Sequence, residues 1–288
     1  MRALLARLRR VLIIAAVILV LLVLAGATYQ GAATALERRQ FPHPGRLVDV
    51  GGHQLHLYCI GAGAPTVVLE APATGMSAAW GWVQSDVAQV TRACTYDRAG
   101  LGWSEAGDRG YDPAAVPGEL HALLERANEP GPYLIAGQGL GAALATLFAA
   151  RYGAEVAALV LVDPPLNDRP ALRSVTRLLN ASPWLARAGV LRATRMLSSH
   201  ASGLPDVAAR PLSAFLNRPD HLTRAAAELA GWNRTVMLAA AAPLDPAIPI
   251  ARVEGAGPSH TALLTDQARG AAVASFIRAV VMQVRAPR

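Results

Sequence analysis

The sequence contains no lysine, so all 27 of its basic residues are arginine, and it has only two cysteines. Charged residues make up 16% of the 288 positions and hydrophobic residues 53%, which excludes a disordered chain and suffices for one domain with a short appendage. Apart from an N-terminal group the arginines are scattered, so the net charge of +7 does not indicate nucleic-acid binding. Repeats, low-complexity tracts and metal-type Cys/His spacing are also lacking, and no metal or cofactor is predicted.

The N-terminal segment is apolar and follows a basic flank. Residues 1–10 carry four arginines, and residues 11–29 contain no charged or strongly polar side chain. A run of this length can cross a bilayer and exceeds the ~7–15 residues of a signal-peptide core. The sequence therefore predicts a transmembrane helix through residues 11–29. Ala25-Gly26-Ala27 has the small-x-small form of a cleavage site, so secretion after signal cleavage is the alternative.

The charges around this segment predict its orientation. Four arginines precede it, whereas Glu37-Arg38-Arg39 after it is mixed in sign. Because the more basic flank stays in the cytoplasm, we expect a single-pass membrane protein whose main domain lies on the extracytoplasmic side. Residues 30–45, which end in two prolines and a glycine, are interpreted as a linker.

Beyond the linker, short apolar runs alternate with longer segments of helical spacing. A hairpin followed by repeated strand and helix units is typical of a mostly parallel sheet covered by helices, which is an α/β fold. Strands are predicted at residues 46–50, 54–59, 66–70, 92–97, 133–136 and 158–163, with further strand-like segments at 235–239 and 248–253. Helices are predicted at residues 78–90, 113–127, 140–152 and 263–284.

No strand is predicted in residues 164–232, which have helical composition and several internal prolines. We interpret this segment as a helical cap inserted in an α/β core that comprises residues 46–163 and 233–288. The composition of the cap favours a small apolar molecule as the occupant of the cleft beneath it.

Three stretches resemble the α/β-hydrolase superfamily: Thr66 to Ala71, Tyr96 to Ser104, and the strand–turn–helix from Tyr133 to Tyr152. Their order and spacing together are specific. The likeness extends over nearly all of residues 46–288 and is greatest to bacterial membrane-anchored members. This resemblance implies an α/β-hydrolase fold with an inserted cap, and an activity in the ester or amide hydrolase class.

The resemblance places a nucleophile elbow, G-x-S-x-G, directly after the strand at 133–136. Here the five residues are Gly137-Gln138-Gly139-Leu140-Gly141, so glycine occupies the nucleophile position. Gly139 has no side chain to attack a carbonyl group. The elbow holds its central residue in a backbone conformation that costs roughly 1–3 kcal/mol for an ordinary side chain, and glycine largely avoids this cost. Loss of the nucleophile is therefore expected to stabilise the turn.

The other catalytic positions follow from the same resemblance. His260, just before the last predicted helix, matches the catalytic histidine. Two aspartates compete for the acid position: Asp245 follows the penultimate predicted strand, and Asp163 follows the strand after the elbow, as in some lipases. Asp245 keeps the usual chain order and is preferred, although the fourteen residues between it and His260 are fewer than usual.

The resemblance also assigns the oxyanion hole to two backbone N–H groups. One belongs to Leu140 at a helix N-terminus, and the other to Ala73 in the loop after Glu70. Pro72 stands where the family usually has glycine, which restricts the loop and removes one N–H group. We therefore expect a hole of altered shape.

Three functions stay open. The resemblance implies a hydrolase, but Gly139 predicts one that is catalytically impaired or non-catalytic. Alternatively, a His–Asp dyad in an apolar pocket could act as a general base without a nucleophile. The third is dinucleotide binding, because Gly137, Gly139 and Ala142 also match the fingerprint G-x-G-x-x-A, with Asp163 as the ribose ligand. Such a fingerprint normally opens its domain, whereas here the hydrolase-like half precedes it.

The two cysteines, Cys59 and Cys94, lie near the ends of the second and fourth predicted strands. In the usual sheet order of the α/β-hydrolase fold these two strands are neighbours, which brings a disulfide within reach if their register agrees. An even pair in an oxidising compartment tends to be joined. Two buried inert thiols are the alternative.

Overall fold

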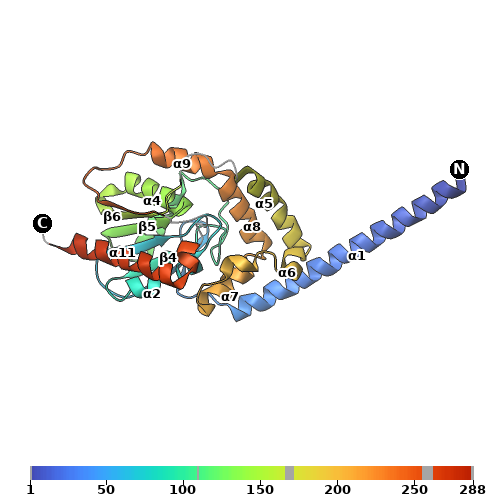
Figure 1. Cartoon of the computed structure of the whole chain (residues 1–288), viewed down its shortest axis with the longest axis horizontal. Helices are drawn as coiled ribbons and strands as arrows, with labels where there is room; N and C mark the ends of the chain where they lie inside the picture. The colour runs from blue at the N-terminus through green and yellow to red at the C-terminus, as the bar shows by residue number, and fades with distance from the viewer. Residues whose placement is uncertain (1, 109, 166–171, 255–261, 287–288) are drawn as a thin grey trace.

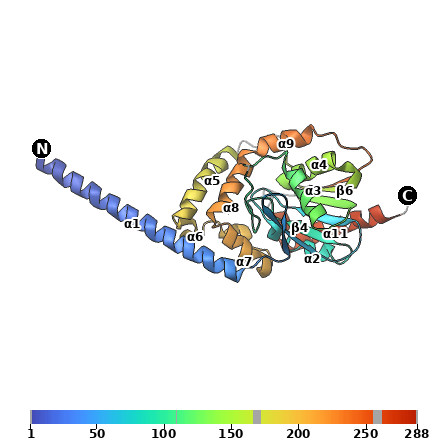
Figure 2. The same cartoon turned by 180° about the vertical axis from the view of Figure 1, so that it is seen from behind.

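The structure is a computed structural model that describes residues 2–108, 110–165, 172–254 and 262–286. It consists of an α/β domain and one long helix, α1 (Arg2–Gln40), that projects from it (Figure 1). A seven-stranded sheet lies between helices on both faces, and several further helices lie between the sheet and α1 (Figures 1 and 2). The predicted α/β architecture, a sheet covered by helices, is therefore present.

The sheet has the strand order β1-β2-β4-β3-β5-β6-β7. The pairs β1–β2 and β2–β4 are antiparallel, and all other neighbouring strands are parallel. The strands are β1 (Arg46–Asp49), β2 (Gln54–Ile60), β3 (Thr66–Glu70), β4 (Ala93–Tyr96), β5 (Tyr133–Gln138), β6 (Val156–Val162) and β7 (Ile250–Val253). Because β3 to β7 run parallel, their carboxyl ends meet at one edge of the sheet, where sites form in folds of this kind.

The core consists of two apolar layers on either side of the central strands. All five residues of β3 are buried, as expected for a strand covered on both faces. On one face, α3 (Val116–Arg126) and α4 (Leu140–Arg151) contribute Leu120 and Phe148. On the other face, α11 (Gln267–Arg285) contributes Ile277. A 3-10 turn at Gly153–Glu155 joins α4 to β6.

Two of the predicted helices are divided. The segment 78–90 forms a 3-10 turn, Ser77–Trp80, and one short helix, α2 (Gln84–Val87). Gly81 lies between them and permits close packing, since a β carbon there would lie 2.8 Å from the Cβ of Ala208. The last predicted helix is divided into α10 (Ala262–Thr265) and α11, because the Asp266 carboxylate accepts a 2.9 Å hydrogen bond from the N–H of Arg269 and caps α11.

Between β6 and β7, the residues that the structure describes are helical wherever they are regular. Its elements are α5 (Leu172–Arg187), α6 (Val190–Thr194), a 3-10 turn (Ser198–Ala201), α7 (Asp206–Phe215), α8 (Pro219–Ala230) and α9 (Trp232–Ala240). We call α5 to α8 the helical insert. The predicted strand at 235–239 is wrong, because these residues lie in α9. Trp232 and Val236 lie one helical turn apart, and both pack in one cluster with Leu140. The buried residues of this segment therefore have the spacing of a helix.

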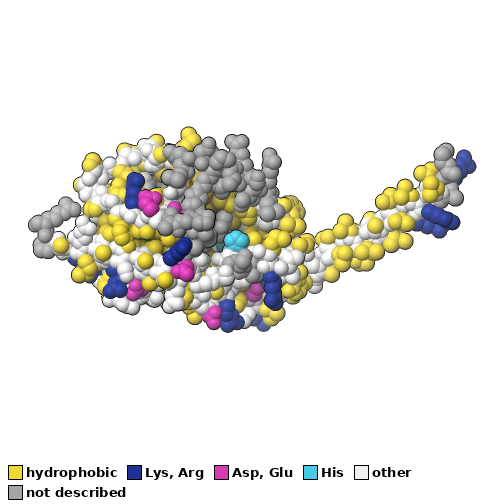
Figure 3. All heavy atoms as spheres, viewed as in Figure 1, with side chains coloured by type: hydrophobic (Ala, Val, Ile, Leu, Met, Phe, Trp, Pro, Cys, Tyr) yellow, Lys and Arg dark blue, Asp and Glu magenta, His cyan; other side chains and the backbone are white. Residues whose placement is uncertain are grey.

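Helix α1 continues to Gln40, so most of the predicted linker is helical. An 18-residue window of α1 has a mean hydropathy of 3.1, and none of it is buried. Figure 3 shows apolar side chains along the projecting part and basic side chains at its tip. Its length and composition fit a membrane span or a signal sequence. The C-terminal part of α1 packs on the helical insert through a face that includes Gly26, Gln30 and Glu37.

Cys59 and Cys94 lie directly opposite each other in the antiparallel pair of β2 and β4. Their sulfur atoms are joined in a disulfide, so the two strands have the register that the bridge requires. The structure describes no free cysteine.

Candidate active site

The turn between β5 and α4 has the geometry of a nucleophile elbow. Gly139 links the strand directly to the helix and has φ 55° and ψ −121°, a conformation that side chains of L-residues rarely adopt. Its N–H donates a 3.0 Å hydrogen bond to the carbonyl of Val162, and its own carbonyl accepts one from the N–H of Ala142 at 2.9 Å. The turn is therefore held by the neighbouring strand β6 and by the first turn of α4.

The three glycines of the elbow serve different purposes. A β carbon on Gly137 would lie 2.3 Å from the carbonyl oxygen of Gly141, and one on Gly141 would lie 2.5 Å from the carbonyl oxygen of Ala71. These two positions accept only glycine because backbone atoms fill the space. A β carbon on Gly139 would meet nothing within 4 Å. The nucleophile position thus has room for a side chain, and only the backbone conformation favours glycine there.

Asp163 is the candidate acid that lies next to the elbow. It follows β6 directly, and β6 pairs with β5 so that Gln138 lies opposite Val162. Asp163 is buried, has a φ of 46°, and donates its N–H to the carbonyl of Val253 at 2.7 Å. A non-glycine residue at positive φ is held there by its surroundings and is common at functional sites.

Asp245, the acid that the sequence favoured, lies elsewhere. It is exposed, and its carboxylate accepts a 2.8 Å hydrogen bond from the N–H of Ala247 within its own turn. It precedes β7 and adjoins Ile248, which packs in one cluster with Val156 at the amino end of β6. Asp245 therefore lies at the opposite edge of the sheet from Gly139. The segment expected to be a strand before Asp245 is helix α9, whereas the triad order places the acid after a strand, and the choice between the two aspartates stays a prediction.

His260 and Ser259 lie outside the described residues. The assignment of His260 as the catalytic histidine remains a prediction of the sequence.

The two N–H groups assigned to the oxyanion hole lie beside the elbow. Leu140 begins α4, where helix N–H groups have no intrahelical partner. Within the described chain neither its N–H nor that of Ala73 donates a hydrogen bond to the protein. Leu140 and Ala73 belong to one apolar cluster with Leu229 of α8 and Trp232 of α9. The helical insert and α9 therefore make an apolar wall around this corner of the site.

A buried ion cluster positions the loop that carries Ala73. The guanidinium of Arg98 donates to Glu70 at 2.6 Å and to the two carboxylate oxygens of Glu228 at 2.7 and 2.8 Å. It also donates to the carbonyls of Ala71 and Pro72 at 2.8 and 2.9 Å. Burial favours the neutral form of Arg98, but the charges of Glu228 and Glu70 outweigh burial and raise its pKa well above the usual range.

The two carboxylates around Arg98 have distinct partners. Burial raises the pKa of Glu70 despite the opposing effect of Arg98, and the Tyr96 hydroxyl donates a short hydrogen bond to it. Glu228 also accepts a 3.0 Å hydrogen bond from the N–H of Thr74, a residue with φ of 61°. The role of Glu228 cannot be recognised in the sequence, because a single glutamate in an otherwise ordinary helical segment carries no signal of its partner.

The described His–Asp pair is structural. The side chains of His56 and Asp97 are fully buried, and Nδ1 of His56 lies 3.0 Å from Oδ2 of Asp97. The other ring nitrogen of His56 bonds the carbonyl of Pro44. Asp97 also accepts hydrogen bonds from the N–H groups of Ser77 at 2.6 Å and Trp103 at 2.9 Å. With both ring nitrogens engaged and no exposure, this pair has no route to a substrate.

Electrostatics at this pair favour the ionised forms of both groups. Burial would lower the pKa of His56, but the charge and hydrogen bond of Asp97 outweigh it and raise that pKa above 6.5. Burial would likewise raise the pKa of Asp97, but His56 and the backbone donors lower it below 3.8. Both partners of His56 are acceptors, which requires a proton on each ring nitrogen.

His221 of α8 connects the helical insert to two loops of the core. Its Nδ1 accepts a 3.1 Å hydrogen bond from the N–H of Gly102, and its Nε2 lies 3.1 Å from the carbonyl of Thr74, to which it donates. This pattern requires the neutral ring with the proton on Nε2. Burial lowers the pKa of His221, which agrees with that assignment.

Solved structures of hydrolytic enzymes share this architecture. A thermophilic esterase from Thermogutta terrifontis superposes with a TM-score of 0.61 at 18% identity, over 81% of this chain and 95% of the esterase. A putative ancestral haloalkane dehalogenase gives 0.63 at 18% identity, over 84% and 100% of the two chains. A putative lipase from Acinetobacter baumannii gives 0.61 at 18% identity, over 88% and 96%.

These likenesses establish that the chain is an α/β-hydrolase-fold protein. The neighbours do not favour the dinucleotide-binding alternative or the dyad enzyme. No protein-family model matches the chain.

Curated proteins of related sequence match only a part of the chain. An uncharacterized protein of Schizosaccharomyces pombe is 34% identical over 106 residues, which are 35% of this chain and 20% of that protein. The uncharacterized protein YqjL of Bacillus subtilis is 32% identical over 108 residues, 38% of this chain and 43% of YqjL. The chain thus spans less than half of the length of these relatives, and their printed names carry no activity.

Proposed function

We propose that this chain is a membrane-anchored α/β-hydrolase-fold protein that binds a small apolar molecule beside Gly139 and does not form an acyl-enzyme. One observation carries the proposal: the residue in the elbow conformation, at φ 55° and ψ −121°, is glycine. Acyl transfer in this fold begins with the attack of a side chain at that position. The flanking glycines and the strand–turn–helix geometry are kept, so the elbow itself retains its shape without its nucleophile.

The apolar surroundings of the elbow support the nature of the ligand. Leu140, Leu229, Trp232 and Val236 cluster there, with Ala73 on the loop side. Ligand pockets are lined mainly by such side chains, with a few polar groups that fix orientation. The N–H groups of Leu140 and Ala73 lie in this corner and donate no hydrogen bond to another described residue. They suit a molecule with one carbonyl or hydroxyl group on an apolar body.

The N-terminal helix and the disulfide support the anchor and its orientation. The apolar run of α1 is long enough to cross a bilayer, and the four arginines before it favour a cytoplasmic N-terminus. The domain then lies on the extracytoplasmic side, an oxidising compartment in which the Cys59–Cys94 bridge is expected to persist.

Labelling with a fluorophosphonate probe tests the catalytic part of this proposal. We expect the full-length chain to stay unlabelled and Gly139→Ser to label at one site, with Gly139→Ala as the matched control that strains the turn equally but has no hydroxyl group. Stoichiometric labelling of the natural chain would contradict the proposal. Ser77 and Ser104, both buried, and Ser259 are the serines to map in that event.

A further inference from the structure

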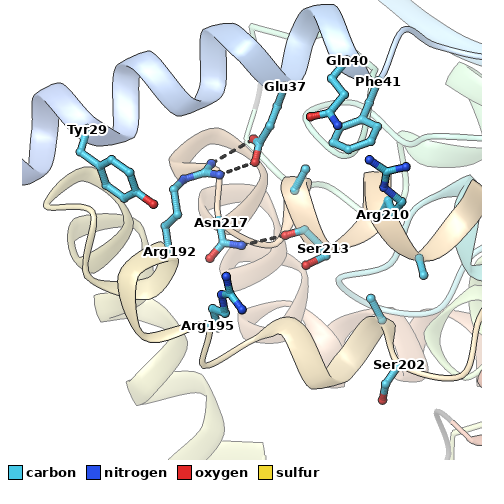
Figure 4. Close-up of a pocket in the computed structure, with 13 residues that line it drawn as sticks. Tyr29, Glu37, Gln40, Phe41, Arg192, Arg195, Ser202, Arg210, Ser213 and Asn217 are labelled. Atoms are coloured by element: carbon cyan, nitrogen blue, oxygen red, sulfur yellow. Dashed lines mark hydrogen bonds and ion pairs between the residues drawn. The ribbon is translucent and has the colours of Figure 1, made fainter. Parts of the chain in front are cut away.

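A pocket of about 560 Å³ lies between α1 and the helical insert, and none of its lining residues belongs to the elbow. Figure 4 shows the side chains that line it, which come from the C-terminal part of α1 with the residue after it and from the segment that runs from α6 to the residues before α8. Its polar lining consists chiefly of Tyr29, Glu37, Arg192, Arg195, Arg210 and Asn217.

The pocket carries more positive than negative charge. Arg192 is fully engaged, because it binds both carboxylate oxygens of Glu37 and donates a 2.9 Å hydrogen bond to Gln30. Arg195 and Arg210 are exposed, and neither forms an ion pair with any residue that the structure describes. Arg210 lies over the ring of Phe41 with 5.5 Å between guanidinium carbon and ring centroid. Two guanidinium groups are therefore available to an anion in this pocket.

A buried polar group in the lining also lacks a partner. Asn217 is 6% exposed, and its side-chain N–H donates to the carbonyl of Ser213 at 2.7 Å. Among the described residues its Oδ1 has no hydrogen-bond partner. The adjacent Arg218 is buried as well, with its guanidinium carbon 3.9 Å from the ring centroid of Phe215. Its Nε lies 4.0 Å from Glu37, and neither Nε nor Nη2 has a hydrogen-bond partner among the described residues. A buried acceptor without a donor is costly, and a ligand hydroxyl group would satisfy it.

Along α1, the pocket lies at the level where lipid headgroups are expected. Tyr29 ends the apolar run and lines the pocket, so the pocket begins where the helix leaves the hydrocarbon. One turn earlier, Gly26 contacts the corner between α5 and α6 so closely that a β carbon there would lie 2.0 Å from the carbonyl oxygen of Ala188. Trp184 and Val190 on this corner are 72% and 40% exposed, as is typical of side chains that enter a membrane interface.

We propose that this pocket binds the headgroup of an anionic phospholipid from the leaflet in which α1 ends. Arg195 and Arg210 pair with the phosphate, and Oδ1 of Asn217 accepts a hydrogen bond from a hydroxyl group of the headgroup, as in a glycerol headgroup. This inference rests on the membrane anchor of the proposed function. A soluble phosphate monoester shares part of this chemistry, and the experiment below separates the two sources.

Native mass spectrometry of the full-length chain in detergent micelles tests the site. The chain is mixed with equal amounts of dioleoylphosphatidylglycerol and dioleoylphosphatidylcholine, and the ratio of the two retained lipids is measured. We expect phosphatidylglycerol to be retained preferentially. Its excess should fall about fivefold in Arg195→Ala or Arg210→Ala and about twentyfold in the double variant. Both side chains are exposed and unpaired, so these variants are expected to fold, which far-UV circular dichroism verifies.

Arg252→Ala with Arg269→Ala is the matched control, since it removes the same charge from exposed positions on β7 and α11. An unchanged lipid ratio in the pocket double variant, or an equal fall in the control, would overturn the proposal. Displacement of phosphatidylglycerol by millimolar glycerol 3-phosphate would also overturn it, because the ligand would then be soluble. The intact mass of the purified chain reports separately on the anchor: loss of the first 27 residues would show signal cleavage, whatever the lipid ratio.

Discussion

Arg98 and Glu228 form a buried two-point ion pair, with N–O distances of 2.7 and 2.8 Å, that joins the loop after β4 to helix α8 of the helical insert. The same guanidinium binds Glu70 at 2.6 Å. One arginine thereby connects the sheet, the loop beside the elbow and the insert.

Removal of the arginine should be more destabilising than removal of one of its partners. Arg98→Leu leaves two buried carboxylates without a counter-charge, and we expect the free energy of unfolding to fall by about 3–5 kcal/mol. Glu228→Gln leaves the pair of Arg98 with Glu70, and a smaller loss of about 1.5–3 kcal/mol is expected. Urea unfolding followed by circular dichroism measures both. Equal losses in the two variants would argue that Glu70 does not share the arginine.

Gly139→Ser should restore hydrolysis of a simple aryl ester, with Asp163 rather than Asp245 as the acid. Asp163 adjoins the elbow, whereas Asp245 lies at the other edge of the sheet. In the Gly139→Ser background we expect Asp163→Asn to reduce kcat by roughly 10³–10⁴-fold and Asp245→Asn, the matched control, to leave it unchanged. His260→Ala in the same background tests the histidine that the sequence assigns. A restored activity that depends on Asp245 would refute this assignment.

The pair of His56 and Asp97 should make stability depend on pH. Because the pKa of His56 is raised, its contribution to the free energy of unfolding is complete below pH 6.5 and is lost as the pH rises through the pKa of the folded state. The lowered pKa of Asp97 means that its contribution is present above pH 3.8 and is lost as the pH falls through its folded-state value. The pair therefore stabilises the fold most between pH 3.8 and 6.5.

The comparison that isolates this effect uses His56→Gln. We expect the variant to lose about 1.5–3 kcal/mol of unfolding free energy at pH 5.5 and less at pH 8.5, measured by urea unfolding at both values. His221 titrates in the opposite sense, because its lowered pKa favours the fold above pH 6.5. The natural chain alone would thus report the sum of two opposing histidines. A loss that is the same at both pH values would count against a charged His56.

The disulfide should be present in the purified protein and should stabilise it. The two cysteines are 35 residues apart in the chain. For a loop of this length, the loss of unfolded-chain entropy predicts that the bridge raises the free energy of unfolding by about 3–4 kcal/mol. Free-thiol titration of the unfolded, unreduced chain should detect no thiol, and Cys59→Ser with Cys94→Ser should lower the midpoint of urea unfolding. Two reactive thiols would argue against both the bridge and the extracytoplasmic location.

Local patterns of the sequence were sufficient for much of the fold. The short, mainly apolar strands at 66–70 and 133–136 were predicted from the sequence because burial on both faces selects apolar side chains there. Glycines 137 and 141, which flank the elbow, were likewise recognisable because close backbone contacts leave no room for a side chain. The pattern failed at residues 235–239. Thr235 and Val236 favour a strand by propensity, but packing of α9 on Leu140 overrides that preference.

The sequence by itself determined that the nucleophile position holds glycine, that an apolar segment precedes the domain, and that two cysteines are available for one bridge. These are statements about which side chains exist, and no fold can alter them. Only the tertiary structure decided that Asp163 and not Asp245 adjoins Gly139, that Glu228 pairs with Arg98, and that α1 packs on the helical insert. Such pairings join segments far apart in the chain. The hydrophobic periodicity of one segment carries no information about which residue of the other segment becomes its partner.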